Sequence, residues 1–95
     1  MVVQENKKAD MNTFNFYDFL DQNGYEKETV RDRTGKTAYT NYQKELEKNT
    51  WNCITIFPDN TYSAVSHDKS FLVVRADQPI TEQEAKELLT KIEKL

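Results

Sequence analysis

The apolar and polar positions of the chain follow two different periods, and the clearest helical pattern lies at the C-terminal end. Thr81 and Glu84 stand three residues apart, which is the spacing of a capping box at a helix N-terminus. The apolar residues that follow share one stripe about 120° wide: they are Ala85, Leu88, Leu89, Ile92 and Leu95. The pattern predicts a helix over residues 81–95 with one face against a core.

Before this helix the pattern has a period of two, which is typical of strands. Three runs rich in β-branched and aromatic residues cover residues 51–57, 61–67 and 71–76. They are separated by Pro58-Asp59-Asn60 and Asp68-Lys69-Ser70, which have the composition of turns. Because short connections join antiparallel neighbours, the pattern predicts a three-stranded antiparallel meander.

Side chains alternate across a strand, so the meander has two distinct faces. If each turn contributes three loop residues, Cys53 lies opposite Val65, and Val65 lies opposite Val73. One face is then almost entirely apolar: Ile54, Ile56, Tyr62, Ala64, Leu72, Val74 and Ala76. The other face is mixed: Trp51, Cys53, Thr55, Phe57, Thr61, Ser63, Val65, His67, Phe71, Val73 and Arg75. We expect the helix over residues 81–95 to cover the apolar face.

Two further helices are predicted nearer the N-terminus. Residues 13–23 have Thr13 as N-cap, Gly24 just past the end, and an aromatic arc of about 220°, wider than one stripe. Residues 37–49 carry apolar side chains at spacings of three and four: Ala38, Tyr39, Tyr42 and Leu46. The predicted fold is α+β, with the C-terminal helix on one face of the meander and the N-terminal helices on or beside the other. A fourth strand within residues 29–32 is an alternative.

Composition narrows the class of protein. A chain of 95 residues forms one domain, which we place at residues 13–95 after a flexible tail of residues 1–12. The single cysteine, Cys53, excludes an intramolecular disulfide framework. No apolar run reaches the length of a signal peptide or a membrane span, so we expect a cytoplasmic protein. The net charge of −3 disfavours non-specific binding to nucleic acid, where neutralised phosphates supply most of the affinity.

Residue types that build catalytic and metal sites are sparse. Cys53 and His67 share the mixed face, but they lie diagonally, roughly 7 Å or more apart, and no third group orients them. With the turn residues Asp59 and Asp68 they do not make a convergent set of metal ligands. Gly35-Lys36-Thr37 lacks the upstream glycine and spacing of a phosphate-binding loop. We therefore expect neither an enzyme nor a cofactor.

The mixed face supplies the first functional hypothesis, a small non-enzymatic binding module that regulates or inhibits a partner protein. Its aromatic residues and arginine are types that dominate binding hot spots. If the helix over residues 13–23 covers this face, the outer edge of that helix is exposed instead. The candidate protein-binding residues are Phe16, Phe19, Trp51, Phe57, His67, Phe71 and Arg75. Compact, glycine-poor chains of this kind are common in phages and mobile elements, which suggests such an origin by analogy alone.

The second hypothesis is a nucleic-acid-binding accessory protein that uses residues 27–44. Basic residues alternate there with tyrosines, and base stacking combined with phosphate contacts is how proteins bind single strands. Glu26, Glu28 and Asp32 dilute the positive charge of this stretch. The candidate nucleic-acid-binding residues are Lys27, Arg31, Arg33, Lys36, Tyr39 and Lys44.

Overall fold

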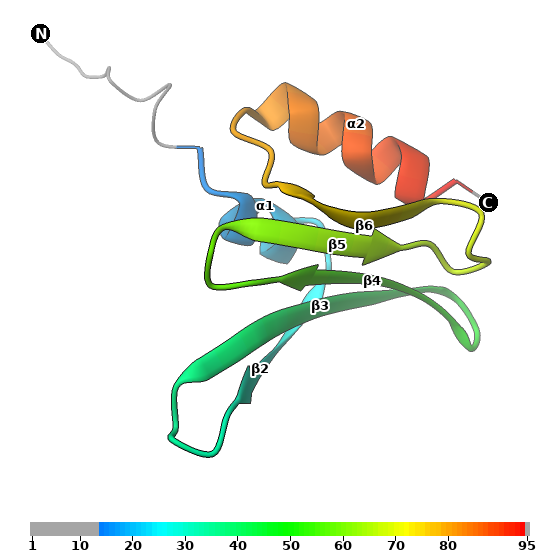
Figure 1. Ribbon diagram of the computed structural model, residues 1–95. Helices are drawn as coiled ribbons and strands as arrows, with labels where there is room; N and C mark the ends of the chain where they lie inside the picture. Colours follow the sequence, from blue (N-terminus) through cyan, green and yellow to red (C-terminus); the bar gives the residue numbers. More distant parts are fainter. Residues whose placement is uncertain (1–13, 95) are drawn as a thin grey trace, which may run out of the picture.

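A computed structural model describes residues 14–94 and shows a short helix, five strands and a second helix in chain order (Figure 1). The elements are α1 (Phe16–Gln22), β2 (Glu26–Arg31), β3 (Thr37–Glu47), β4 (Thr50–Ile56), β5 (Thr61–Val65), β6 (Leu72–Asp77) and α2 (Glu82–Ile92). The strands form one antiparallel sheet in the sequential order β2-β3-β4-β5-β6. The α+β class is confirmed, but the predicted meander lacked two of the five strands. The predicted tail, residues 1–12, lies outside the described residues.

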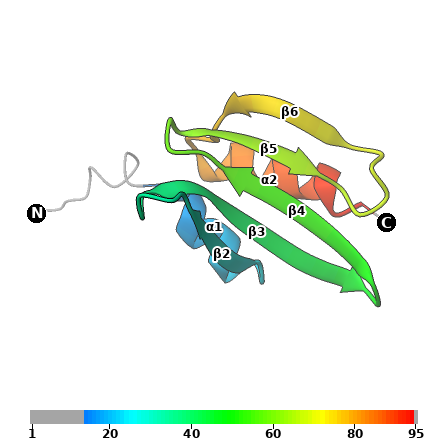
Figure 2. The ribbon, with the colours of Figure 1, turned by 60° about the horizontal axis from the view of Figure 1, so that its bottom comes forward.

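Both helices pack on the same face of the sheet. Figure 2 shows α1 and α2 behind the strands, with α2 across β4 and β5. The core lies between this helical layer and the sheet, and its buried members are Phe16, Phe19, Leu20, Tyr25, Tyr42, Ile54, Ile56, Tyr62, Ala64, Ala85, Leu88, Leu89 and Ile92. The prediction that the N-terminal helix lies on or beside the opposite face is therefore wrong. Its aromatic arc is wide because it contacts both the sheet and α2.

The helix α1 has well-defined ends. Asn15 is its N-cap and accepts a 3.1 Å hydrogen bond from the backbone N–H of Asp18, so α1 starts later than predicted, and Thr13 lies outside the described residues. Gly24 follows the last turn with a φ of +89°, as predicted for the residue that ends the helix. The backbone N–H of Tyr25 then donates to the carbonyl of Leu20 at 3.0 Å, which turns the chain directly into β2.

Residues 37–49 contain the whole of the long strand β3 and the turn that follows it, and the helix predicted there is wrong. Pairing explains the difference, because β3 is hydrogen-bonded to β2 on one side and β4 on the other. Tyr42 is buried on the core face, whereas Tyr39 lies on the opposite face beside Phe57. The helical spacing of these apolar residues is a coincidence that strand pairing overrides, since tertiary context outweighs local propensity.

The register of β6 differs by one residue from the prediction. Cys53 does pair with Val65, as predicted, but Val65 pairs with Leu72 instead of Val73. The cause is a longer turn: Ser66 and Phe71 exchange hydrogen bonds, so the loop has one residue more than expected, and His67 belongs to it. A one-residue slip exchanges the faces of a strand.

A bulge in the β5–β6 pairing, between Tyr62 and Ala64, completes the altered arrangement. After it, Tyr62 pairs with Ala76, which returns to the core face. Leu72 and Val74, predicted for the apolar face, are instead 60% and 77% exposed. Their positions are corrections to the predicted core.

The closing helix α2 follows the sequence prediction closely. Thr81 is the N-cap and its Oγ1 accepts a 3.1 Å hydrogen bond from the N–H of Glu84. The Glu84 carboxylate reaches back to the N–H of Ile80 at 3.0 Å, one residue before the cap. Ala85, Leu88, Leu89 and Ile92 are all buried, as predicted; α2 itself ends at Ile92, and Leu95 lies outside the described residues.

A polar clamp fixes the C-terminal end of α2 to the sheet. The hydroxyl of Tyr25 donates to Glu93 at 2.9 Å, and Lys44 forms a half-buried ion pair with the same carboxylate at 3.3 Å. Burial, reinforced by the Glu93 charge, raises the pKa of Tyr25 well above its usual value. Nearby, the carbonyl oxygen of the fully buried Asn52 accepts a 2.8 Å hydrogen bond from the N–H of His67. These contacts hold polar groups under the helix at one end of the core.

Candidate interaction surface

The face of the sheet opposite the helices is not covered by any described element, and we call it the open face. Strand pairing assigns its residues, because cross-strand partners lie on the same side of the sheet. It is formed by Glu26, Glu28, Val30, Tyr39, Asn41, Gln43, Glu45, Trp51, Cys53, Thr55, Phe57, Thr61, Ser63, Val65, Leu72, Val74, Arg75 and Asp77. The central strands are therefore exposed to solvent on the open face and covered by the helices on the other face.

Apolar side chains concentrate on the β4–β6 half of the open face. Cys53, Val65 and Leu72 are successive cross-strand neighbours and form a row across three strands. Trp51 lies on the same face of β4 and is 42% exposed, and Val74 is the most exposed of the large apolar residues. We call these five residues the apolar band. An exposed group of this kind, contiguous across strands, marks an interaction surface more often than scattered apolar residues do.

A polar row separates the apolar band from an aromatic pair. Thr55 lies between Asn41 and Ser63 in the register, and its hydroxyl donates to the Asn41 side-chain oxygen at 3.2 Å. Beyond this row, the Tyr39 and Phe57 rings contact each other with centroids 6.4 Å apart. The open face thus alternates apolar and polar rows.

Arg75 is held flat on the open face by three contacts. Its guanidinium carbon lies 3.7 Å from the centroid of the Phe57 ring, a cation–π arrangement. Its Nε donates to Thr61 at 2.7 Å and its Nη2 pairs with Asp59 at 3.2 Å. The predicted candidates Phe57 and Arg75 therefore act as one unit, and the arginine charge is already paired.

The β2–β3 side of the open face carries negative charge. Glu26 and Glu28 on β2 and Glu45 on β3 are all exposed. Glu45 pairs directly with Trp51, and these two residues line a shallow hollow of about 210 Å³ together with Glu26, Gly24, Gln43 and Lys44. An indole beside carboxylates has the chemistry to bind a cationic side chain.

The structure does not bring the other predicted protein-binding residues to this surface. Phe16 and Phe19 are 2% and 9% exposed and belong to the core. The exposed patch was expected of them only if their helix covered the mixed face, and that condition is not met. Phe71 is half-buried and packs against the core from the other side of β6. His67 is in the β5–β6 loop, where its Nε2 lies 3.1 Å from the backbone oxygen of Lys94.

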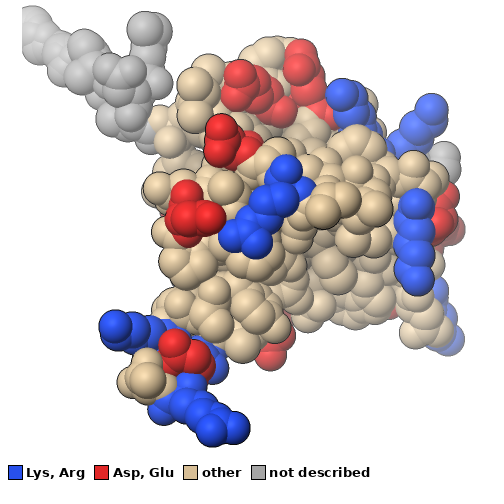
Figure 3. Space-filling model, in the orientation of Figure 1, with Lys and Arg blue, Asp and Glu red and all other residues tan. Residues whose placement is uncertain are grey.

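The predicted nucleic-acid-binding residues fall into separate groups. Arg31, Arg33 and Lys36 lie at the tip of the β2–β3 hairpin, where Figure 3 shows Lys and Arg side chains gathered around an acidic one. Lys44 is at the far end of β3, in the clamp with Glu93, and Tyr39 lies beside Phe57 on the open face. Lys27 is an exposed residue of β2 that pairs with Tyr42 on the helical side of the sheet.

The pairing of Cys53 with Val65 leaves His67 in the loop beyond the end of β5, with its own partner on Lys94. Burial raises the pKa of the Cys53 thiol, which lowers its thiolate fraction. The geometry does not supply the activated nucleophile that a cysteine–histidine pair requires. Among residues 14–94, no group of three or more histidine, cysteine, aspartate and glutamate side chains is placed to hold a metal ion.

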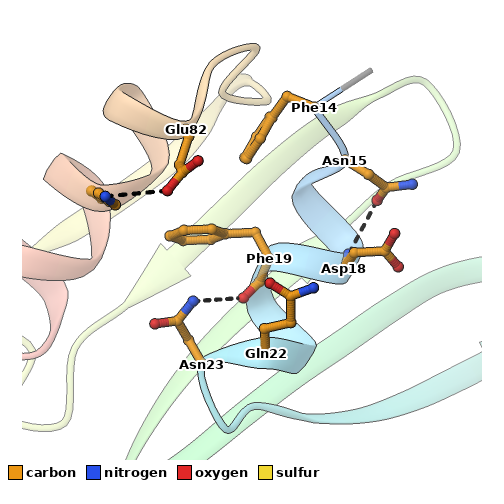
Figure 4. A pocket seen from close by; sticks show the side chains of 8 residues that line it. Phe14, Asn15, Asp18, Phe19, Gln22, Asn23 and Glu82 are labelled. Carbon is orange, nitrogen blue, oxygen red and sulfur yellow. Dashed lines mark hydrogen bonds and ion pairs between the residues drawn. The ribbon is translucent and has the colours of Figure 1, made fainter. Parts of the chain in front are cut away.

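A groove with a volume of about 530 Å³ lies between α1 and α2 on the helical side. Figure 4 shows the Phe14 and Phe19 rings facing Glu82 of α2 across it. Four of its polar side chains are engaged in local structure: Asn15 caps α1, Asn23 donates to the carbonyl of Phe19 at 2.7 Å, and Glu82 pairs with Lys86 at 3.1 Å. These capping and intrahelical contacts leave the groove as a packing junction between two helices.

Leu72 and Val74 were not predicted as surface residues, and Tyr39 was predicted in a helix. The run Phe71-Leu72-Val73-Val74 has no alternation, so the sequence contains no signal that selects one face.

Neither helix within residues 14–94 is long and apolar enough to cross a membrane. Comparison with known proteins finds no matching family model, no matching curated protein and no matching solved structure.

Proposed function

We propose that this protein is a non-catalytic binding module that uses the open face to engage, and thereby regulate or inhibit, a partner protein. The observation that carries the proposal is the one-sided covering of the sheet. Both helices lie on the core face, while Leu72, Val74 and Trp51 remain 60%, 77% and 42% exposed on the other. Large aliphatic and aromatic side chains grouped on a rigid sheet form the kind of surface that a partner desolvates on binding.

The charged residues around the open face indicate which charge the partner surface should carry. The acidic residues Glu26, Glu28 and Glu45 border the open face on the β2–β3 side, and the cation Arg75 is paired with Asp59. Complementary potentials favour encounter and specificity. The matching partner surface has an apolar centre, to cover the apolar band, and lysine or arginine side chains on one flank.

The hollow beside Trp51 is the point at which these two requirements meet. A lysine or arginine of the partner that enters it contacts the indole face and the carboxylates of Glu26 and Glu45 together. Such a contact combines apolar burial with charge pairing in one residue. This makes Trp51 the expected centre of the interface.

The test is affinity capture from nuclease-treated lysate with the full chain and three variants. Trp51→Ala and Leu72→Ala remove side chains from the apolar band, and each is expected to weaken retention of the partner tenfold or more. Ile80→Ala is the matched control, because Ile80 is 74% exposed but lies outside the open face. Circular dichroism checks that all three variants fold.

Equal retention by Trp51→Ala, Leu72→Ala and Ile80→Ala would exclude the open face as the binding site. Glu26→Lys together with Glu28→Lys is expected to weaken binding and to reduce its dependence on salt. A captured species that disappears on nuclease treatment, and whose binding needs Arg33 and Lys36, would support the nucleic-acid hypothesis instead.

A further inference from the structure

The sheet has two edge strands, β2 and β6, and they differ in how many charged and apolar residues they carry. The strand β2 reads Glu-Lys-Glu-Thr-Val-Arg, so four of its six residues are charged. Charged side chains on an edge strand discourage pairing with another chain. The strand β6 reads Leu-Val-Val-Arg-Ala-Asp and exposes Leu72 and Val74. The edge of β6 is thus the less charged of the two, with Arg75 and Asp77 as its two charged residues of six.

The one cation of β6 does not guard its edge. The Arg75 side chain extends inward over β5 and β4, where it stacks on Phe57 and bonds Thr61. These contacts direct its charge away from the outer side of β6. The outer backbone groups of this strand are therefore flanked by Leu72 and Val74, with Asp77 at the end of the strand.

The burial pattern of β6 is the same in both directions. From Leu72 to Asp77 the side chains are exposed, half-buried, exposed, exposed, half-buried and exposed. The bulge produces this symmetry, because it places Val74 and Arg75 on the same face and returns Ala76 to the core. When the order of exposed and half-buried positions is the same in both directions, two antiparallel copies of the strand place exposed residues opposite exposed ones and half-buried residues opposite half-buried ones.

We propose that β6 of one molecule pairs with β6 of a second copy about a two-fold axis, joining two sheets into one. Face matching fixes the register: Val73 lies opposite Ala76 of the second copy, Val74 opposite Arg75, and Leu72 opposite Asp77. The half-buried Val73 and Ala76 then extend the core across the axis, because both pack against it already. This inference is independent of the proposed partner protein.

The position of the helices leaves room for this pairing. In Figure 2, α2 lies behind β4 and β5, and β6 projects beyond it at the edge of the sheet. The helices of the two copies would lie on the same side of the joined sheet and the two open faces on the other. The dimer therefore enlarges the open face without covering it.

The test is the mass of the full chain in solution, measured by sedimentation from micromolar to millimolar concentration. The expected result is a reversible increase towards twice the chain mass of 11.2 kDa. Val74→Lys places a charge at the pairing edge and is expected to weaken association tenfold or more. Thr29→Lys adds a lysine at an exposed position of the other edge strand, β2, and is the matched control that still dimerises.

A third variant separates edge pairing from stacking of two open faces. Trp51→Ala lies on β4, away from the β6 edge, so an edge-paired dimer survives it, whereas a face-stacked dimer is weakened. A monomer at every concentration would overturn the proposal, and so would a dimer that tolerates Val74→Lys. Slower hydrogen exchange of the β6 amides at high concentration is the expected direct sign of strand pairing. Loss of partner capture has no bearing on any of these readings.

Discussion

The two faces of β4 show how one strand serves two purposes. Asn52, Ile54 and Ile56 point to the helices and are almost completely buried, at 0%, 0% and 2% exposure. Trp51 and Thr55, their neighbours in sequence, point to the open face, where Trp51 is 42% exposed. The core face is covered by two helices from opposite ends of the chain, and the open face by none of the described elements. Stability therefore resides on one side, and the residues available for recognition on the other.

The largest effect is expected on the core face. Ile54→Ala leaves a cavity beneath the helices at a position with 0% exposure, and it should lower the free energy of unfolding by about 2–5 kcal/mol. Urea denaturation followed by circular dichroism measures the loss. Thr55→Ala, one position away on the open face, is the control and should cost about 1 kcal/mol or less. Similar losses for both would remove the distinction between the faces.

An intermediate effect is expected at the clamp that holds α2 on the core face. Tyr25→Phe removes the hydroxyl that donates to Glu93 and leaves that half-buried carboxylate with Lys44 alone. We expect a loss of about 1–2 kcal/mol in the same denaturation experiment. Tyr39→Phe on the open face tests the contrast, because no hydrogen bond of its hydroxyl is present among the described residues. A larger loss from Tyr39→Phe would contradict the assignment of the clamp.

A small effect on stability is expected on the open face itself. Leu72→Ser changes a side chain that is 60% exposed, so the free energy of unfolding should stay within about 0.5 kcal/mol of the unmodified chain. The same variant is expected to weaken partner binding strongly, as Leu72→Ala does. Calorimetry and affinity capture, carried out on one preparation, separate the two effects. A variant that unfolds early would place Leu72 in the core after all.

The smallest effect concerns a turn that belongs to neither face. Hydrogen bonds from the Ser70 hydroxyl and backbone N–H lower the pKa of Asp68 to about 2. The folded-state pKa thus lies below the unfolded value of about 3.9, so the contribution to stability is present above pH 4 and is lost as the pH falls to about 2. Asp68→Asn should flatten this part of the stability curve. An unchanged pH dependence would show that Asp68 makes no net contribution.

The strands that sequence analysis found are those whose period is unambiguous. Residues 51–57 and 61–65 alternate clearly, and the structure confirms the pairing of Cys53 with Val65. The stretch over residues 37–49 ends in Lys-Glu-Leu-Glu-Lys-Asn, which favours a helix locally, and only its two strand neighbours reverse that preference. No local pattern contains this information, because it depends on residues on both sides of the stretch in space.

The candidate surface was predictable only in part, for a related reason. Trp51 and Phe57 lie on the open face as alternation predicted, because β4 keeps a regular register with β3 and β5 over this region. Arg75 also lies on that face, but only because the bulge in the β5–β6 pairing offsets the one-residue slip of β6. Leu72 and Val74 depend on the length of one turn and on one bulge. A single extra loop residue moved both side chains from the predicted core to the surface. Short apolar runs at a sheet edge are therefore the least predictable part of such a surface.

Trp51 is an intrinsic fluorescent probe of the open face. It is the single tryptophan of the chain, it lies 42% exposed at the centre of the proposed interface, and it is absent from the core. Its fluorescence therefore reports the polarity of the open face. A partner that covers the indole should shift its emission to shorter wavelength, while pairing along the distant β6 edge should leave that emission nearly unchanged. The emission wavelength of Trp51 therefore distinguishes the two proposed associations in the unlabelled, unmodified protein.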